Sequence, residues 1–300
     1  MTAQTDKANG IDICYEIFGD AGAEPIVLIM GLAAQMIHWD DEFCQKLAAR
    51  GFRVIRFDNR DIGKSSKMSG GKRLTAVELL KLRFLKIPLA APYRLIDMAR
   101  DTTGLMDALG IKSAHLVGAS MGGMIAQEVA ISFPQRVRSL TSIMSTTGNP
   151  RVPPPTREAA AMLMAPPPRS KEEFIVRFGQ TWKVLRAGSF PEEEARDPGR
   201  AERVFARGLN PAGVGRQLRA VLASGSRKER LHGLKTPTLV IHGTVDPLVH
   251  PEGGKDTAAS IPGAKLLMIE GMGHALPMRF WPEIIAAIDK HAHGAAAQAA

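Results

Sequence analysis

The chain has 300 residues, of which 45% are hydrophobic and 23% are charged, a composition typical of globular proteins that excludes a disordered or fibrous class. The sequence has no apolar N-terminal leader and no apolar run of the roughly 18 residues that a membrane span needs. Residues 151–230 hold most of the formal charge of +9 but no nucleic-acid-binding signature. We therefore expect a cytoplasmic protein that binds no nucleic acid and does not insert stably into a membrane.

Apolar runs typical of strands alternate with helical patterns, which predicts an α/β protein with a mostly parallel sheet flanked by helices. Ile11–Phe18 alternates like a half-exposed strand, whereas Pro25–Met30 is a continuous apolar run typical of a buried one. In chain order, further strands are predicted at 52–57, 114–117, 137–144, 238–242 and 265–269, and helices at 38–50, 98–109, 121–133, 171–186 and 281–291. Residues 294–300 are expected to form a frayed tail.

The alternation is interrupted once, between residues 147 and 232. This stretch contains two Pro-Pro-Pro runs with helical patterns between them. We interpret residues 147–232 as a helical cap inserted into a core domain made of residues 1–146 and 233–300. A shorter irregular stretch with an amphipathic, lysine-rich pattern lies at about 64–92. Cys14 and Cys44 lack the spacing of a metal site or a disulfide framework, and we expect both to be reduced packing residues.

The run Gly118-Ala-Ser-Met-Gly-Gly123 joins a predicted strand to a predicted helix. This is the setting of a nucleophile elbow, in which a serine occupies a sharp turn and small neighbours allow close backbone contact. Ser120 is therefore the candidate nucleophile. The alternative is a serine that merely caps a helix beside closely packed glycines.

A serine nucleophile needs a base and a carboxylate that orients the base. His274 follows the last predicted strand in a glycine-containing loop, and Asp246 follows the strand before it. Both would lie with Ser120 at the carboxyl edge of the sheet, where ligands bind in such sheets. Glu270 is the competing carboxylate. Among the other histidines, His242 and those at 115, 291 and 293 are interpreted as structural or solvated.

Acyl transfer also requires donors for the oxyanion of the tetrahedral intermediate. In this arrangement they are usually the backbone amide after the nucleophile and one amide from the loop after the buried strand. The candidates are the amides of Met121 and Leu32. Because the donors belong to the backbone, the side chains at these positions are free to vary.

These residues together resemble the α/β-hydrolase superfamily over about residues 10–292. The motifs Gly118–Gly123 and Pro237–Asp246 are similar to those of bacterial carboxylesterases related to aclacinomycin methylesterase and the family V lipolytic enzymes. The resemblance implies a mostly parallel eight-stranded sheet, a Ser120-Asp246-His274 triad, and neither a cofactor nor a metal. The chain has Met30 where the family often has histidine, and Asp61 departs from the frequent Arg-Gly-x-Gly pattern.

The predicted function is hydrolysis of a small-molecule carboxylic ester through an acyl-enzyme. Lactonases, carbon-carbon bond hydrolases and cofactor-free haloperoxidases or perhydrolases share this triad, and a ligand receptor on the same fold is an alternative of another class. Met30, Gly31, Met144 and Met272 are candidate substrate contacts, with core filling as the alternative for the methionines. The basic excess of the cap is interpreted as a solvated helix surface or as a means of attracting an anionic substrate. The sequence makes no prediction of oligomeric state.

Overall fold

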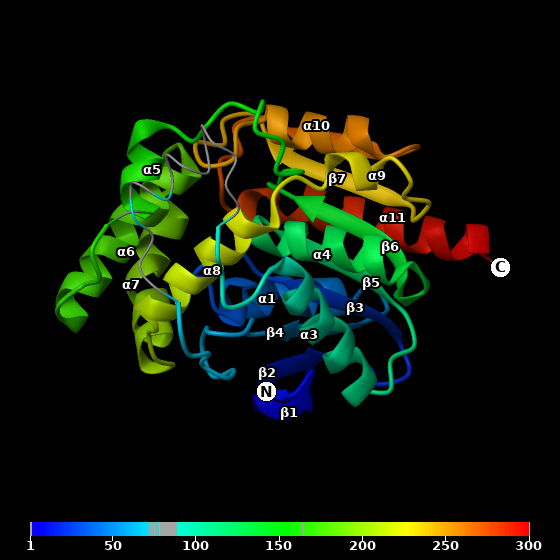
Figure 1. The fold of residues 1–300 in the computed structure, drawn as a ribbon, viewed down its shortest axis with the longest axis horizontal. Coiled ribbons are helices and arrows are strands. Elements are labelled where there is room, and N and C mark those ends of the chain that lie inside the picture. Colours follow the sequence, from blue (N-terminus) through cyan, green and yellow to red (C-terminus); the bar gives the residue numbers. More distant parts are fainter. Residues whose placement is uncertain (1, 72–74, 76–77, 79–88, 164, 300) are drawn as a thin grey trace.

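The computed structural model describes residues 2–71, 75, 78, 89–163 and 165–299. They form an eight-stranded sheet with the order β1-β2-β4-β3-β5-β6-β7-β8 (Figure 1). Strands β1, β2 and β4 pair antiparallel, and every pairing from β4 through β3 to β8 is parallel. The strands are β1 (Gln4–Ala8), β2 (Ile11–Phe18), β3 (Glu24–Ile29), β4 (Phe52–Phe57), β5 (Ala114–Ala119), β6 (Val137–Ile143), β7 (Thr238–Gly243) and β8 (Lys265–Ile269). The predicted fold class is confirmed.

Helices cover both faces of the sheet and divide its core in two. Helices α3 and α4 pack with one hydrophobic cluster, and α1 and α11 pack with the other. The helices are α1 (Asp41–Ala48), α3 (Leu95–Ala108), α4 (Met121–Ser132), α5 (Arg157–Leu163), α6 (Lys171–Arg186), α7 (Pro191–Ala206), α8 (Pro211–Ser224), α9 (Lys228–Leu231), α10 (Glu252–Ser260) and α11 (Trp281–Ala299), with short 3₁₀ turns η1 (Met36–His38), η2 (Pro134–Arg136) and η3 (Met278–Phe280). Among the described residues, no helix is both long and apolar enough to cross a membrane.

Two predictions about element boundaries were wrong, each for a local reason. The helix expected from His38 begins at Asp41, because the carboxylate of Asp40 accepts a hydrogen bond from the Glu42 amide and caps α1 there. The tail expected to fray continues α11 through Ala299, since its alanines favour a helix. Strand β1 and helix α10 were not predicted at all. The amphipathic pattern expected at 64–92 lies largely outside the described residues.

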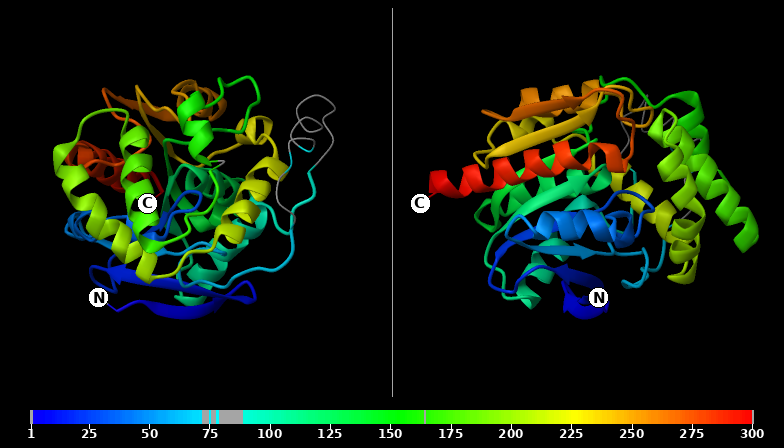
Figure 2. Two further views of the ribbon diagram at one scale, coloured as in Figure 1. Left: turned by 90° about the vertical axis from the view of Figure 1, so that its left-hand side faces the viewer. Right: turned by 180° about the vertical axis from the view of Figure 1, so that it is seen from behind.

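Helices α5 to α8 come between β6 and β7 and lie together at one end of the sheet, as Figures 1 and 2 show. Their contact with the core includes the loop after β8, where the amide of His274 donates a hydrogen bond to the Leu185 carbonyl of α6, at 2.6 Å. The helices therefore cover the carboxyl edge of the parallel strands. Both cysteines lie in the core, Cys14 on β2 and Cys44 on α1, and both are free.

Asp61 connects the core to α8 through a buried ion pair. The carboxylate accepts two hydrogen bonds from the Arg216 guanidinium, at 2.7 and 2.9 Å, and a third from the Tyr93 hydroxyl. Asp61 is fully buried and has a φ of 73°, a conformation that glycine adopts more easily. The departure from the Arg-Gly-x-Gly pattern at this position thus has a structural reason, because a glycine could not bind Arg216.

We expect Asp61→Asn to lower the free energy of unfolding by about 3 kcal/mol, since removing one partner leaves the other charge buried and uncompensated. Asparagine tolerates a positive φ, so the loss reports on the ion pair and not on the backbone. The measurement is urea unfolding at pH 7. The matched control is Arg203→Ala, which removes an exposed ion pair with Asp41 and should cost less than about 1 kcal/mol. Equal losses in the two variants would contradict the role assigned to burial.

Candidate active site

Ser120 lies in the sharp turn between β5 and α4. Its backbone has φ 56° and ψ −121°, which a non-glycine residue adopts only at a cost of about 1–3 kcal/mol. The surrounding sheet holds the turn in place: the Ser120 amide donates to the Ile143 carbonyl at 2.9 Å, and the Ser145 hydroxyl donates to the Ser120 carbonyl at 2.7 Å. The strained turn is therefore fixed from β6 as well as from its own strand and helix.

The glycines around Ser120 are required by close backbone contacts. A Cβ atom at Gly118 would lie 2.2 Å from the Gly122 carbonyl oxygen, and one at Gly122 would lie 2.0 Å from the Ile29 oxygen. Gly31, just after β3, faces the serine directly, because a Cβ there would lie 3.1 Å from Ser120 Cβ. The end of β3, the end of β5 and the start of α4 thus converge on Ser120.

Asp246 follows β7 and is hydrogen-bonded through both carboxylate oxygens. Its Oδ1 accepts from the amides of Leu248 and Val249, at 2.9 and 2.8 Å, and its Oδ2 lies 2.7 Å from Nδ1 of His274. Burial by itself would raise the pKa of Asp246. The charge of His274 and hydrogen bonds from His242 and His274 outweigh burial and hold the pKa well below its usual value. Asp246 is therefore an anionic hydrogen-bond partner of His274.

His274 is buried in the loop after β8, and this loop is pressed against α6. A Cβ atom at Gly273 would lie 2.3 Å from the Leu185 carbonyl oxygen, so only glycine allows the approach. With Nδ1 at the carboxylate, Nε2 is the ring nitrogen left for proton exchange with a nucleophile. Glu270, the competing carboxylate, is exposed.

His242 is a residue of this site that sequence reasoning did not identify. It is fully buried on β7, and its Nε2 lies 2.8 Å from the Val249 carbonyl and 3.4 Å from Asp246 Oδ2. Because the Val249 carbonyl can only accept a hydrogen bond, the neutral ring of His242 has its proton on Nε2. The same N–H also faces the Asp246 carboxylate. The four-residue spacing between His242 and Asp246 was the available signal, but a histidine inside a strand is ordinarily a packing residue.

The loop after β3 contains the predicted oxyanion donor. The amide of Ala33 donates to Gln217 Oε1 at 3.1 Å, the amide of Ala34 to the Gly31 carbonyl at 3.4 Å, and the amide of Met36 to Asp58. Within the described residues, the amide of Leu32 has no hydrogen-bond partner, and neither has the amide of Met121 at the start of α4. These two amides are available to a ligand beside Ser120.

A family model for the alpha/beta hydrolase fold matches residues 24–279. The chain belongs to this family. Rhodomycin D methylesterase DauP of Streptomyces sp. (strain C5) is 30% identical over 95% of this chain and 96% of its own. The corresponding DnrP of Streptomyces peucetius is 29% identical over the same shares. The solved esterase RhEst1 from Rhodococcus sp. ECU1013 has a similar fold, with a TM-score of 0.72 at 23% identity over 97% of this chain and 100% of its own. The predicted membership in the α/β-hydrolases is confirmed.

The methionines proposed as substrate contacts are buried in this α/β-hydrolase. Met30, Met144 and Met272 belong to the hydrophobic cluster that packs against α1 and α11. The Met30 carbonyl accepts a hydrogen bond from Asn59, and the Met272 carbonyl approaches Gly243 closely. Their contact with substrate stays a prediction. In the part of the chain that the structure describes, no group of three or more His, Cys, Asp or Glu side chains is placed to hold a metal ion.

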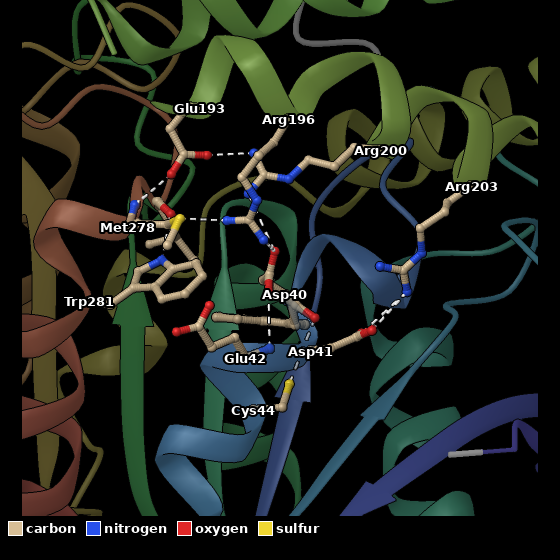
Figure 3. Close-up of polar contacts among 12 residues, drawn as sticks. Asp40, Asp41, Glu42, Cys44, Glu193, Arg196, Arg200, Arg203, Met278 and Trp281 are labelled. Atoms are coloured by element: carbon tan, nitrogen blue, oxygen red, sulfur yellow. Dashed lines mark hydrogen bonds and ion pairs between the residues drawn. The ribbon is translucent and has the colours of Figure 1, made fainter. Parts of the chain in front are cut away.

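Several basic side chains of the hydrolase's inserted segment are paired with acids of the core, and others pair within the segment itself. Figure 3 shows Arg196 and Arg200 reaching Asp40, and Arg203 reaching Asp41, at the start of α1. Further pairs between this segment and the core are Arg207–Asp58, Arg216–Asp61, Arg219–Glu78, Lys228–Asp256 and Arg230–Glu128. The interpretation of the basic excess as a solvated helix surface was wrong for Arg207, Arg216 and Arg219, whose side chains are largely buried in their ion pairs. Arg203 and Arg230 are paired but remain about half exposed.

We expect the strain at Ser120 to appear as a stability difference between two inactive variants. Ser120→Gly relieves the unfavourable φ, whereas Ser120→Ala retains it. The glycine variant should be more stable than the alanine variant by about 1 kcal/mol, the strain less the conformational entropy cost of glycine. Urea unfolding of both variants measures the difference. Because neither has the hydroxyl, the comparison isolates the backbone, and an alanine variant at least as stable as the glycine variant would contradict strain.

Proposed function

We propose that this α/β-hydrolase is a carboxylesterase in which Ser120 is the nucleophile, His274 the general base and acid, and Asp246 the residue that orients the imidazole. The proposal depends chiefly on the contact between His274 Nδ1 and Asp246 Oδ2, which leaves Nε2 free at the edge of the sheet where the strained Ser120 turn lies. The order of the three residues in the chain is the one expected for this fold. The methylesterases that match this chain over nearly its whole length support an enzyme acting on esters.

The reaction takes place in two stages. Ser120 Oγ attacks the ester carbonyl as His274 takes its proton, and the carbonyl electrons pass to the oxygen. The amides of Leu32 and Met121 donate to this oxyanion, and the position of Met121 at the start of α4 adds the positive end of the helix dipole. His274 then protonates the leaving alcohol. Water, deprotonated by His274, hydrolyses the acyl-enzyme and regenerates Ser120.

The inserted segment 147–232 serves in this proposal as a cap over the reaction site. Its helix α6 contacts the His274 loop, and its helix α8 contacts the loop that carries Leu32. Side chains that distinguish substrates would therefore come from these helices, together with Met30, Gly31, Met144 and Met272 around the core loops. A panel of methyl, short-chain and long-chain esters, with lactones and diketones included, would identify the substrate class.

We expect Ser120→Ala to lower kcat by about 10⁴- to 10⁶-fold on a p-nitrophenyl ester, because no other group supplies the nucleophile. The same variant should lose covalent labelling by a fluorophosphonate. The matched control is Ser139→Ala, which removes a buried hydroxyl on β6 that contacts His115, away from the elbow. It should be labelled like the wild type. Turnover that survives in the Ser120 variant would refute the proposal.

We expect anionic and neutral esters with the same acyl chain to show the same dependence of kcat/KM on salt. Several basic side chains of the cap are paired with core acids, which reduces the long-range attraction that they exert on an anion. The measurement is kcat/KM for both esters between low and physiological ionic strength. A steep decrease with salt for the anionic ester alone would instead show that the cap attracts an anion.

A further inference from the structure

Residues 31–34 form a turn whose middle peptide is held by a cap side chain. The turn is closed by the hydrogen bond from the Ala34 amide to the Gly31 carbonyl, and its third residue, Ala33, has a φ of 63°. A positive φ at that position is characteristic of a type II turn, which normally has glycine there. Rotation of the peptide between Leu32 and Ala33 would relieve the strain at Ala33 and give a different turn. Something must therefore hold this peptide in place.

Gln217 of α8 makes the contact that does so. Its Oε1 accepts from the Ala33 amide at 3.1 Å, and its Nε2 donates to the Arg60 carbonyl at 2.9 Å. The side chain is fully buried, so both bonds are protected from water. Arg216, the preceding residue, pairs with Asp61 and fixes α8 at this place. The amide group of Gln217 thus bridges the turn after β3 and the turn after β4.

We propose that Gln217 is a positioning residue for oxyanion stabilisation: it keeps the 31–34 turn in the conformation that aims the Leu32 amide at the reaction site. The inference rests on the proposed function, because it assumes that Leu32 is an oxyanion donor. If the inference holds, the cap influences the rate of the chemical step through Gln217. Loss of Gln217 leaves the Ala33 amide without its acceptor, and the turn then relaxes away from the strained conformation.

The test compares an oxygen ester with its thionoester, whose sulfur accepts hydrogen bonds poorly and gains little from oxyanion donors. In Gln217→Met, which keeps the side-chain volume but neither hydrogen bond, kcat for the oxygen ester should fall by about ten- to a hundred-fold, less than complete loss of a donor costs. The rate with the thionoester should change much less, so that the ratio of the two rates falls. A purely structural defect would lower both rates alike and leave the ratio unchanged.

Two further variants complete the test. Gln217→Glu, protonated in its buried site, can still accept from Ala33 and donate to Arg60, and should retain the wild-type ratio. If Gln217→Met fails to fold, Gln217→Glu still tests the proposal. A fall in the ratio of the two rates in the glutamate variant would overturn it. Arg203→Met removes an exposed cap contact, with Asp41 at the start of α1, that does not involve the turn, and it should leave the ratio unchanged.

The outcomes separate this inference from the proposed function. If Ser120→Ala keeps its activity, the carboxylesterase proposal fails and this inference fails with it. If Ser120→Ala is inactive while Gln217→Met keeps both its kcat and its ratio of rates, only the role of Gln217 is overturned. A fall in the ratio that is confined to Gln217→Met supports the inference.

Discussion

The backbone of α4 begins so close to the end of β3 that one methyl group at Gly122 would overlap the Ile29 carbonyl. This approach bends the chain sharply at Ser120 and brings Gly31 against the serine side chain. The rest of the site follows from the parallel sheet, because β7 and β8 end at the same edge and release Asp246 and His274 there. The candidate chemistry therefore depends on steric fit between backbones before any charge is considered.

The second constraint is electrostatic and joins the inserted helices to the core. Asp58 binds both the Met36 amide, in the chain just after the 31–34 turn, and Arg207 of the segment after α7. Asp61 binds Arg216 of α8. Buried pairs of this kind contribute little net stability, but each costs several kcal/mol when one partner is lost, and they favour one arrangement of the helices over others. Arg207 and Arg216 thus connect the inserted segment to the two loops of the core that carry Asp58 and Asp61.

Local patterns predicted the strands β2 to β8, although not β1, and they selected Asp246 and His274, which the structure brings into contact. Strands β2, β4 and β8 have the predicted bounds, because apolar runs and flanking glycines define strand ends locally. The roles of His242 and Gln217, in contrast, depend on contacts that a linear pattern does not contain. Gln217 meets Ala33 across 184 positions of sequence. The error about the basic excess has the same origin, since the net charge of a segment carries no information about its partners elsewhere in the chain.

The 31–34 turn is the place where the steric and electrostatic constraints meet. Its first residue, Gly31, lies against Ser120. Its middle peptide is bound by Gln217 of α8, and the Arg216–Asp61 ion pair connects α8 to the core. If Leu32 is an oxyanion donor, the cap cannot be exchanged as a simple specificity module, because a change that shifts α8 alters transition-state stabilisation together with substrate binding. Variation in substrate range is then tolerated best at side chains of the cap helices that contact neither the 31–34 turn nor the His274 loop, which Gln217 and the Leu185 carbonyl hold.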